Sequence, residues 1–119
     1  MPPDAVEIIG DLEQFESLLE DELKVKILGE NKFKSGDRKN INILVFRGDE
    51  ESAVETSSVM VKVIGSDFRP LIYHAKADAN GVATVFLKLP TVRSGRAALL
   101  IRAMVDGEET ELRRAISPE

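Results

Sequence analysis

The side chains that most often carry catalysis are scarce in this chain. It has 119 residues, a single histidine and no cysteine, so cysteine nucleophiles, thiolate metal ligands and disulfides are excluded. A serine nucleophile needs a histidine base beside it and a sharp turn such as Gly-x-Ser-x-Gly, and the sequence has no such turn. We therefore expect His74 to be a surface residue on a strand. The chain is predicted not to be an enzyme and to hold no cofactor.

Asp78, Asn80 and Gly81 offer the start of a calcium-binding pattern. A complete EF-hand loop counted from Asp78 needs Gly at its sixth position and Glu at its twelfth, where this chain has Ala83 and Leu89. The same residues suit a tight turn between two strands, because Asn and Gly tolerate positive φ. The sequence predicts a hairpin here and no metal site.

Basic residues gather near residues 24–47, but they lack the features of a nucleic-acid site. Such sites combine positive charge with aromatic stacking platforms or with a helix that enters a groove. Phe33 is the single aromatic residue within 24–39, where most of these basic residues lie, so nucleic-acid binding is not expected. The basic residues are Lys24, Lys26, Lys32, Lys34, Arg38, Lys39 and Arg47.

The first 22 residues differ from the rest in charge and in period. The whole chain has a net charge of -5, and its first segment has acids but no Lys or Arg, which is typical of an arm outside a folded body. Asp4 and Glu7 have the form of a capping box. Apolar residues then recur every three or four positions, which predicts one helical stripe. We expect an acidic arm or short helix over 1–22 and a folded domain over 23–119. The stripe comprises Ala5, Ile8, Leu12, Phe15 and Leu19.

From Leu23 onward the apolar residues alternate with a period of two, which predicts strands. Turn-forming clusters separate them at intervals of about 8–12 residues, as expected of an antiparallel sandwich. We expect an all-β, immunoglobulin-like sandwich of about seven strands. The predicted strands are 23–28, 40–46, 58–64, 70–77, 82–89, 97–105 and 109–116.

One face of the strands is uniformly apolar and predicts the core between two sheets: residues 41, 43 and 45, residues 59, 61 and 63, and odd positions over 83–89 and 99–105. The opposite face is less polar than a solvated face should be, which favours a contact surface. The arm's stripe could pack on this face within one chain or meet a second molecule. The candidate partner contacts are Leu44, Phe46, Met60, Leu100, Met104, Ile8, Leu12, Phe15 and Leu19.

Two stretches resemble known modules. Phe33-Lys34-Ser35-Gly36-Asp37 resembles the aromatic-x-Pro-Gly-acid turn of macroglobulin-type domains, with Ser35 where proline is usual. Asp78-Ala79-Asn80-Gly81-Val82-Ala83 is similar to a hairpin shared by those domains and by bacterial immunoglobulin-like modules of invasin and intimin type. The resemblance covers roughly residues 23–116. It implies a sandwich used as a spacer or adhesion module in bacterial envelope or surface proteins, with no catalytic residues.

We therefore expect a non-catalytic structural or interaction domain. Its partner would be protein, either a neighbouring domain or another subunit, and a homodimer is one form of this. The alternatives are a stand-alone protein that dimerises or binds through its N-terminal helix, and a small-ligand or carbohydrate-binding sandwich. The resemblance favours the periplasm or cell surface, although the chain has no signal peptide, and its apolar runs are too short to insert into a membrane.

Overall fold

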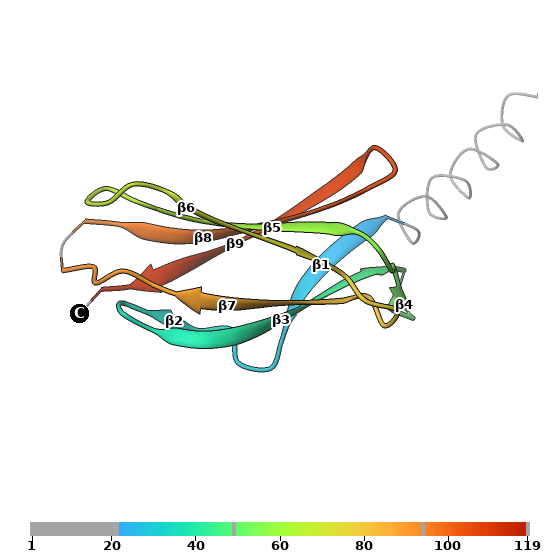
Figure 1. Ribbon diagram of the computed structural model, residues 1–119, viewed down its shortest axis with the longest axis horizontal. Helices are drawn as coiled ribbons and strands as arrows, with labels where there is room; N and C mark the ends of the chain where they lie inside the picture. Colours follow the sequence, from blue (N-terminus) through green and yellow to red (C-terminus); the bar gives the residue numbers. More distant parts are fainter. Residues whose placement is uncertain (1–21, 49, 94, 119) are drawn as a thin grey trace, which may run out of the picture.

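The computed structural model describes residues 22–48, 50–93 and 95–118, and these residues form two packed β-sheets. Figure 1 shows the layers, with β5 and β8 facing β3 and β7. The first sheet has the order β1-β3-β4, and β7 also pairs with β3; the second has the order β2-β9-β8-β5-β6. All pairs are antiparallel except that of β2 with β9, which is parallel. The strands are β1 (Leu23–Leu28), β2 (Phe33–Lys34), β3 (Arg38–Arg47), β4 (Ser52–Ala53), β5 (Ser58–Gly65), β6 (Leu71–Lys76), β7 (Val82–Lys88), β8 (Ala97–Val105) and β9 (Glu108–Ser117).

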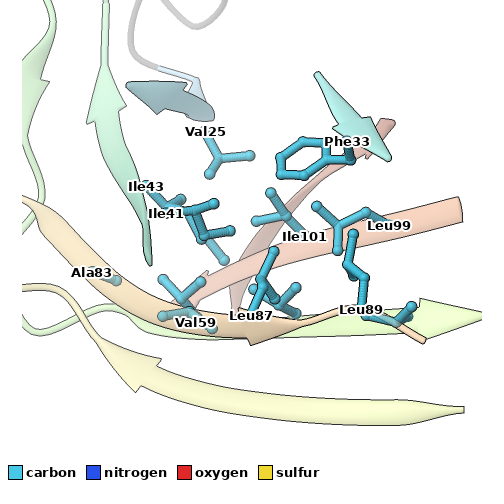
Figure 2. Close-up of a cluster of buried hydrophobic side chains, with 14 of the residues drawn as sticks. Val25, Phe33, Ile41, Ile43, Val59, Ala83, Leu87, Leu89, Leu99 and Ile101 are labelled. Carbon is cyan, nitrogen blue, oxygen red and sulfur yellow. The ribbon is translucent and has the colours of Figure 1, made fainter. Parts of the chain in front are cut away.

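Alternating apolar residues place the core between the two sheets. Side chains on a strand point to opposite faces in turn, and the inward set of β3, β5, β7 and β8 is almost fully buried. Figure 2 shows Ile41, Val59, Leu87, Leu99 and Ile101 meeting there from both layers. Aliphatic and β-branched side chains fill this space and suit a pleated sheet. The predicted core is confirmed, with the exception that Val105 at the end of β8 is only half-buried.

The hairpin before β7 is confirmed as a tight turn. The Gly81 amide donates to the carbonyl oxygen of Asp78 at 2.9 Å, and one Asp78 carboxylate oxygen accepts from the amides of Asn80 (2.8 Å) and Val82 (3.1 Å). Gly81 has φ +76°, and a Cβ on it would lie 2.7 Å from the Val45 carbonyl oxygen. Only glycine fits that position without strain.

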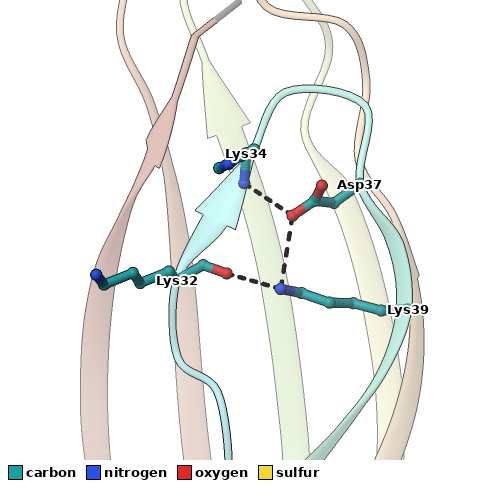
Figure 3. Close-up of polar contacts among 4 residues, drawn as sticks. All are labelled: Lys32, Lys34, Asp37 and Lys39. Atoms are coloured by element: carbon teal, nitrogen blue, oxygen red, sulfur yellow. Dashed lines mark hydrogen bonds and ion pairs between the residues drawn. The ribbon is translucent and has the colours of Figure 1, made fainter.

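The segment before β3 forms a strand that sequence period does not reveal. In Figure 3 the amide of Lys34 donates to Asp37 Oδ2 at 2.9 Å, and Lys39 Nζ donates to the Lys32 carbonyl oxygen at 2.7 Å. The Lys39 ammonium also lies 4.7 Å from the centroid of the Phe33 ring. These contacts hold Phe33, which is only 2% exposed, in the core beside Ile116 of β9.

The structure confirms the all-β class. Each of the seven predicted strands is present, and β2 and β4 are additional two-residue strands. The described residues include no helix, and the predicted helix over 1–22 lies almost wholly outside them. The immunoglobulin-like type of sandwich and the domain boundary after residue 22 stay predictions.

Candidate partner-binding face

The five-stranded sheet turns one face away from the core, and we call it the outer face. The pairing register lays its residues in rows across the strands. Met60 lies between His74 and Arg102, and Leu100 lies between Lys62 and Arg113. Apolar side chains remain accessible on it: Ile72 is 53% and Met104 is 37% exposed, and Met60, Ile64 and Leu100 are half-buried. An accessible apolar surface of this kind is typical of a contact surface.

A groove of about 570 Å³ lies at the end of this face where β9 finishes. Small side chains form its floor, because Ala98 of β8 is directly opposite Ala115 of β9. Ile64, Ile116 and Pro118 add apolar walls, and two arginines line it. The lining residues are Ile64, Gly65, Gly95, Arg96, Ala97, Ala98, Arg113, Ala115, Ile116 and Pro118.

The charge on the outer face and its groove is predominantly positive. Four basic side chains of these strands and Arg96 of the groove outnumber two acidic side chains. One acid, Glu111, is already paired with Arg102 at 3.4 Å. A ligand with apolar and carboxylate groups would complement this surface. The charged residues are Lys62, Lys76, Arg96, Arg102 and Arg113 with Glu109 and Glu111.

At the other end of the sandwich an ion pair joins the two sheets. Arg47 at the end of β3 donates to both carboxylate oxygens of Glu108 at the start of β9, at 2.7 Å and 3.2 Å. The side-chain hydrogen bond from Arg47 lowers the pKa of Glu108 below its ordinary value of 4.5, although desolvation opposes the change. Leu23 pairs with Arg47, so residues 1–22 join the body at this end.

The structure separates the candidate contacts into two groups. Met60, Leu100 and Met104 lie together on the outer face. Leu44 and Phe46 belong to the other sheet, where each is only 9% exposed. The candidate contacts Ile8, Leu12, Phe15 and Leu19 lie outside the described residues.

Leu44 and Phe46 are shielded from solvent by side chains of the neighbouring strands. Lys26 lies directly opposite Leu44 on β1, and its ammonium is 5.5 Å from the centroid of the Phe46 ring. Glu51 holds that ammonium in an ion pair, and Ala53 of β4 is opposite Phe46. The lysine stem therefore covers apolar surface while its charge stays in solvent.

His74 is exposed on the edge strand β6, opposite Met60 of β5, and is a surface residue on a strand as predicted. The described residues contain no group of three His, Cys, Asp or Glu side chains placed to hold a metal ion. They also contain no helix long and apolar enough to cross a membrane.

Sequence reasoning missed the groove and its two arginines. The apolar period of the sequence does not mark the groove residues Arg96, Ala98, Arg113 and Ala115. They come together only because β8 and β9 pair in one register.

The fold is similar to that of two solved structures of one enzyme. Superoxide reductase (neelaredoxin) from Ignicoccus hospitalis has a solved structure that matches with a TM-score of 0.60 and 16% identity, over 92% of this chain and 91% of that one. A second structure of this enzyme matches with a TM-score of 0.56 and 16% identity, over 90% of this chain and 87% of that one. No protein-family model matches the sequence. No curated protein matches it either.

These matches overturn several expectations. The resemblance to invasin, intimin and macroglobulin-type modules is wrong, because the fold is shared with superoxide reductase over nine-tenths of the chain. The predictions of a spacer or adhesion domain of the bacterial envelope, and of a chain that is not an enzyme, are contradicted because that neighbour is an enzyme. A dimer built through the arm and a carbohydrate-binding or small-ligand sandwich fit the neighbour no better. The misleading residues were turn residues, which many β-folds share.

Proposed function

We propose that this chain is one component of a redox enzyme assembly, in which a second protein carries the redox-active group and binds to the outer face. The observation that supports this most is the superoxide reductase fold over 92% of the chain. Fold alone does not assign an activity, so the residues must decide which part of such a system this chain can supply.

The side chains present do not fit a resident redox metal. Reduction of superoxide adds an electron to the anion, and proteins perform one-electron chemistry of oxygen with metals, haem or flavin. Imidazole and thiolate are the usual ligands for iron and copper. This chain offers His74 alone and no cysteine, and its described residues form no three-donor cluster. We infer that a redox centre would be held by residues outside this sequence, and we assign it to a partner protein.

The outer face has the chemistry to bind such a partner. Accessible apolar residues such as Ile72 and Met104 lie beside the groove, whose arginines are Arg96 and Arg113. Interfaces often place arginine beside apolar residues, and a positive surface attracts an acidic partner and accelerates its binding. We expect the partner to present carboxylates around an apolar patch.

The first test asks whether the chain alone is a metal enzyme. The purified full chain is incubated anaerobically with ferrous iron and desalted, and its iron content and superoxide consumption are measured. We expect no stoichiometric iron and no consumption above the free-iron control. Retention of one iron per chain together with superoxide reduction would show that the chain is itself the enzyme and would overturn the proposal.

The second test asks for the partner. The tagged full chain is expressed in its native host and recovered, and the bound material is analysed for iron, copper, haem and flavin. We expect a redox protein that is lost with Arg113→Glu and kept with Lys24→Glu, which makes the same charge change on the other sheet. Recovery of partners without a redox group, or equal recovery with both variants, would contradict the assignment.

A further inference from the structure

We propose that residues 4–19 pack as an acidic amphipathic helix on the outer face of the same chain, with their N-terminal end at the groove. Three observations carry this: the accessible apolar residues of the face, its positive charge, and the place where the segment joins the body. The first two have been described above.

The dimensions of segment and face agree. Residues 5–19 as a helix are about 21 Å long at 1.5 Å per residue. The run of β8 from Met104 to Ala98 is about 20 Å long at about 3.3 Å per residue. The apolar stripe is therefore as long as the apolar part of the face, which Met104, Met60, Leu100, Ile72 and Ile64 form.

The point of attachment fixes the direction. Leu23 lies at the end of the sandwich where Arg47 pairs with Glu108, which is the end where β8 finishes at Val105. Residues 20–22 can span about 10 Å when extended, which takes the chain around the edge of β9. Leu19 then comes near Met104, and the helix runs back toward the groove.

The charges match in that direction. At 100° per residue, Asp4, Asp11 and Glu16 flank the stripe. Asp4 arrives at the groove end, where Arg96 and Arg113 lie. The stripe itself would cover apolar residues that are now accessible, and burial of that area favours the contact.

The alternative surface for the stripe is already covered. Leu44 and Phe46 are each 9% exposed, and the ammonium of Lys26 lies 5.5 Å from the centroid of the Phe46 ring. A helix placed there would have to displace the ion pair of Lys26 with Glu51. On the outer face, Ile72 and Met104 are already accessible to the stripe.

A spin label tests the contact directly, because the chain has no native cysteine. Ser17→Cys places a nitroxide on the side of the helix opposite the stripe. In the isotope-labelled full chain we expect loss of amide signals at Lys62, Leu100 and Arg113. A mixture of spin-labelled chain without isotope and isotope-labelled chain without spin label should show no such loss, since the contact is within one chain.

Two matched variants test whether the apolar stripe itself makes the contact with the outer face. Phe15→Asp puts a charge in the stripe and should restore the amide signals. Gln14→Asp adds the same charge away from the stripe and should leave the signal loss unchanged. Signal loss only in the mixture, signal loss around Leu44, or full signals throughout would each overturn the proposal.

One consequence rests on the proposed function: the segment and the redox partner compete for the outer face. Phe15→Asp should then increase recovery of the redox protein by the tagged chain. Unchanged recovery, where the spin label shows the contact, would overturn the competition. Absence of any redox protein from both chains would overturn the proposed function and leave the spin-label result standing.

Discussion

At the scale of single residues, Glu108 shows how one contact sets a pH response. Its folded-state pKa lies below 4.5 because Arg47 donates to its carboxylate. A lowered pKa means that the contact stabilises the fold at and above the ordinary pKa, and that this stabilisation is lost as the pH falls through the folded value. We expect a carbon-detected titration of Glu108 to give a pKa below 4.5.

The control for this prediction replaces Arg47, which donates the hydrogen bonds to Glu108. Arg47→Gln should return the pKa of Glu108 toward its ordinary value and flatten the acid side of the stability profile. The carboxylate is exposed, so the change in stability should be small. A titration curve that is the same with Arg47 and with Gln would contradict the assigned cause.

Adding a single methyl group at Gly81 should lower the stability of the fold strongly. Its φ of +76° disfavours any side chain, and a Cβ would approach the Val45 carbonyl oxygen to 2.7 Å. We expect Gly81→Ala to lower the free energy of unfolding by about 2–3 kcal/mol. Gly29→Ala is the matched control, because Gly29 has φ +77° with nothing within 4 Å of its Cβ position. It should cost about 1 kcal/mol in urea unfolding, and equal losses would contradict the role of the close approach.

At the scale of elements, substitutions of Phe46 and Phe86 show which outward-facing residues contribute to stability. Both lie on the four-stranded sheet away from the main core, but Phe46 is 9% and Phe86 is 49% exposed. We expect Phe46→Asp to lose about 3–5 kcal/mol, because a covered ring is removed and a charge takes its place. Phe86→Asp should change stability by no more than about 0.5–1 kcal/mol. If the two variants melt at the same temperature, the claim that Lys26 shields Phe46 from solvent would be contradicted.

Sequence predicted the strands well because their signal is local. The alternation of Val59, Val61 and Val63 is readable without knowing what faces them. The strands β2 and β4 have only two residues each, which is too short for an alternating pattern to be recognised in the sequence. The cover of Phe46 was missed for a related reason: it depends on Lys26, which comes opposite Leu44 only through the pairing of β1 with β3.

The groove lay beyond sequence prediction because it belongs to no single element. Arg113 was visible only as one charge on an alternating strand. Its place in the groove with Arg96 follows from the register of β8 with β9 and from the turn at Gly95. Local turn residues near Gly81 suggested a family, and the arrangement of the whole molecule contradicted it.

At the scale of the whole molecule, Tyr73 joins the two sheets along one side. Its hydroxyl on β6 donates to the Lys88 carbonyl oxygen and accepts from the Lys88 amide, both at 3.3 Å. We expect Tyr73→Phe to lower stability by about 0.5–1.5 kcal/mol and to speed hydrogen exchange in β6 before the other strands. Uniform acceleration over both sheets would show that the hydroxyl has no local role there.

The parallel pairing of β2 with β9 has a consequence for biosynthesis. Phe33 pairs with Ile116, so this side chain finds its permanent neighbour only after all the residues between them have been synthesised. Pairings between distant parts of a chain are slow to form, and apolar surface left open in the meantime is prone to aggregation. A ribosome carrying a nascent chain of this protein therefore displays an unfinished hydrophobic edge until Ile116 has left the exit tunnel, and a chaperone would have that interval in which to bind it.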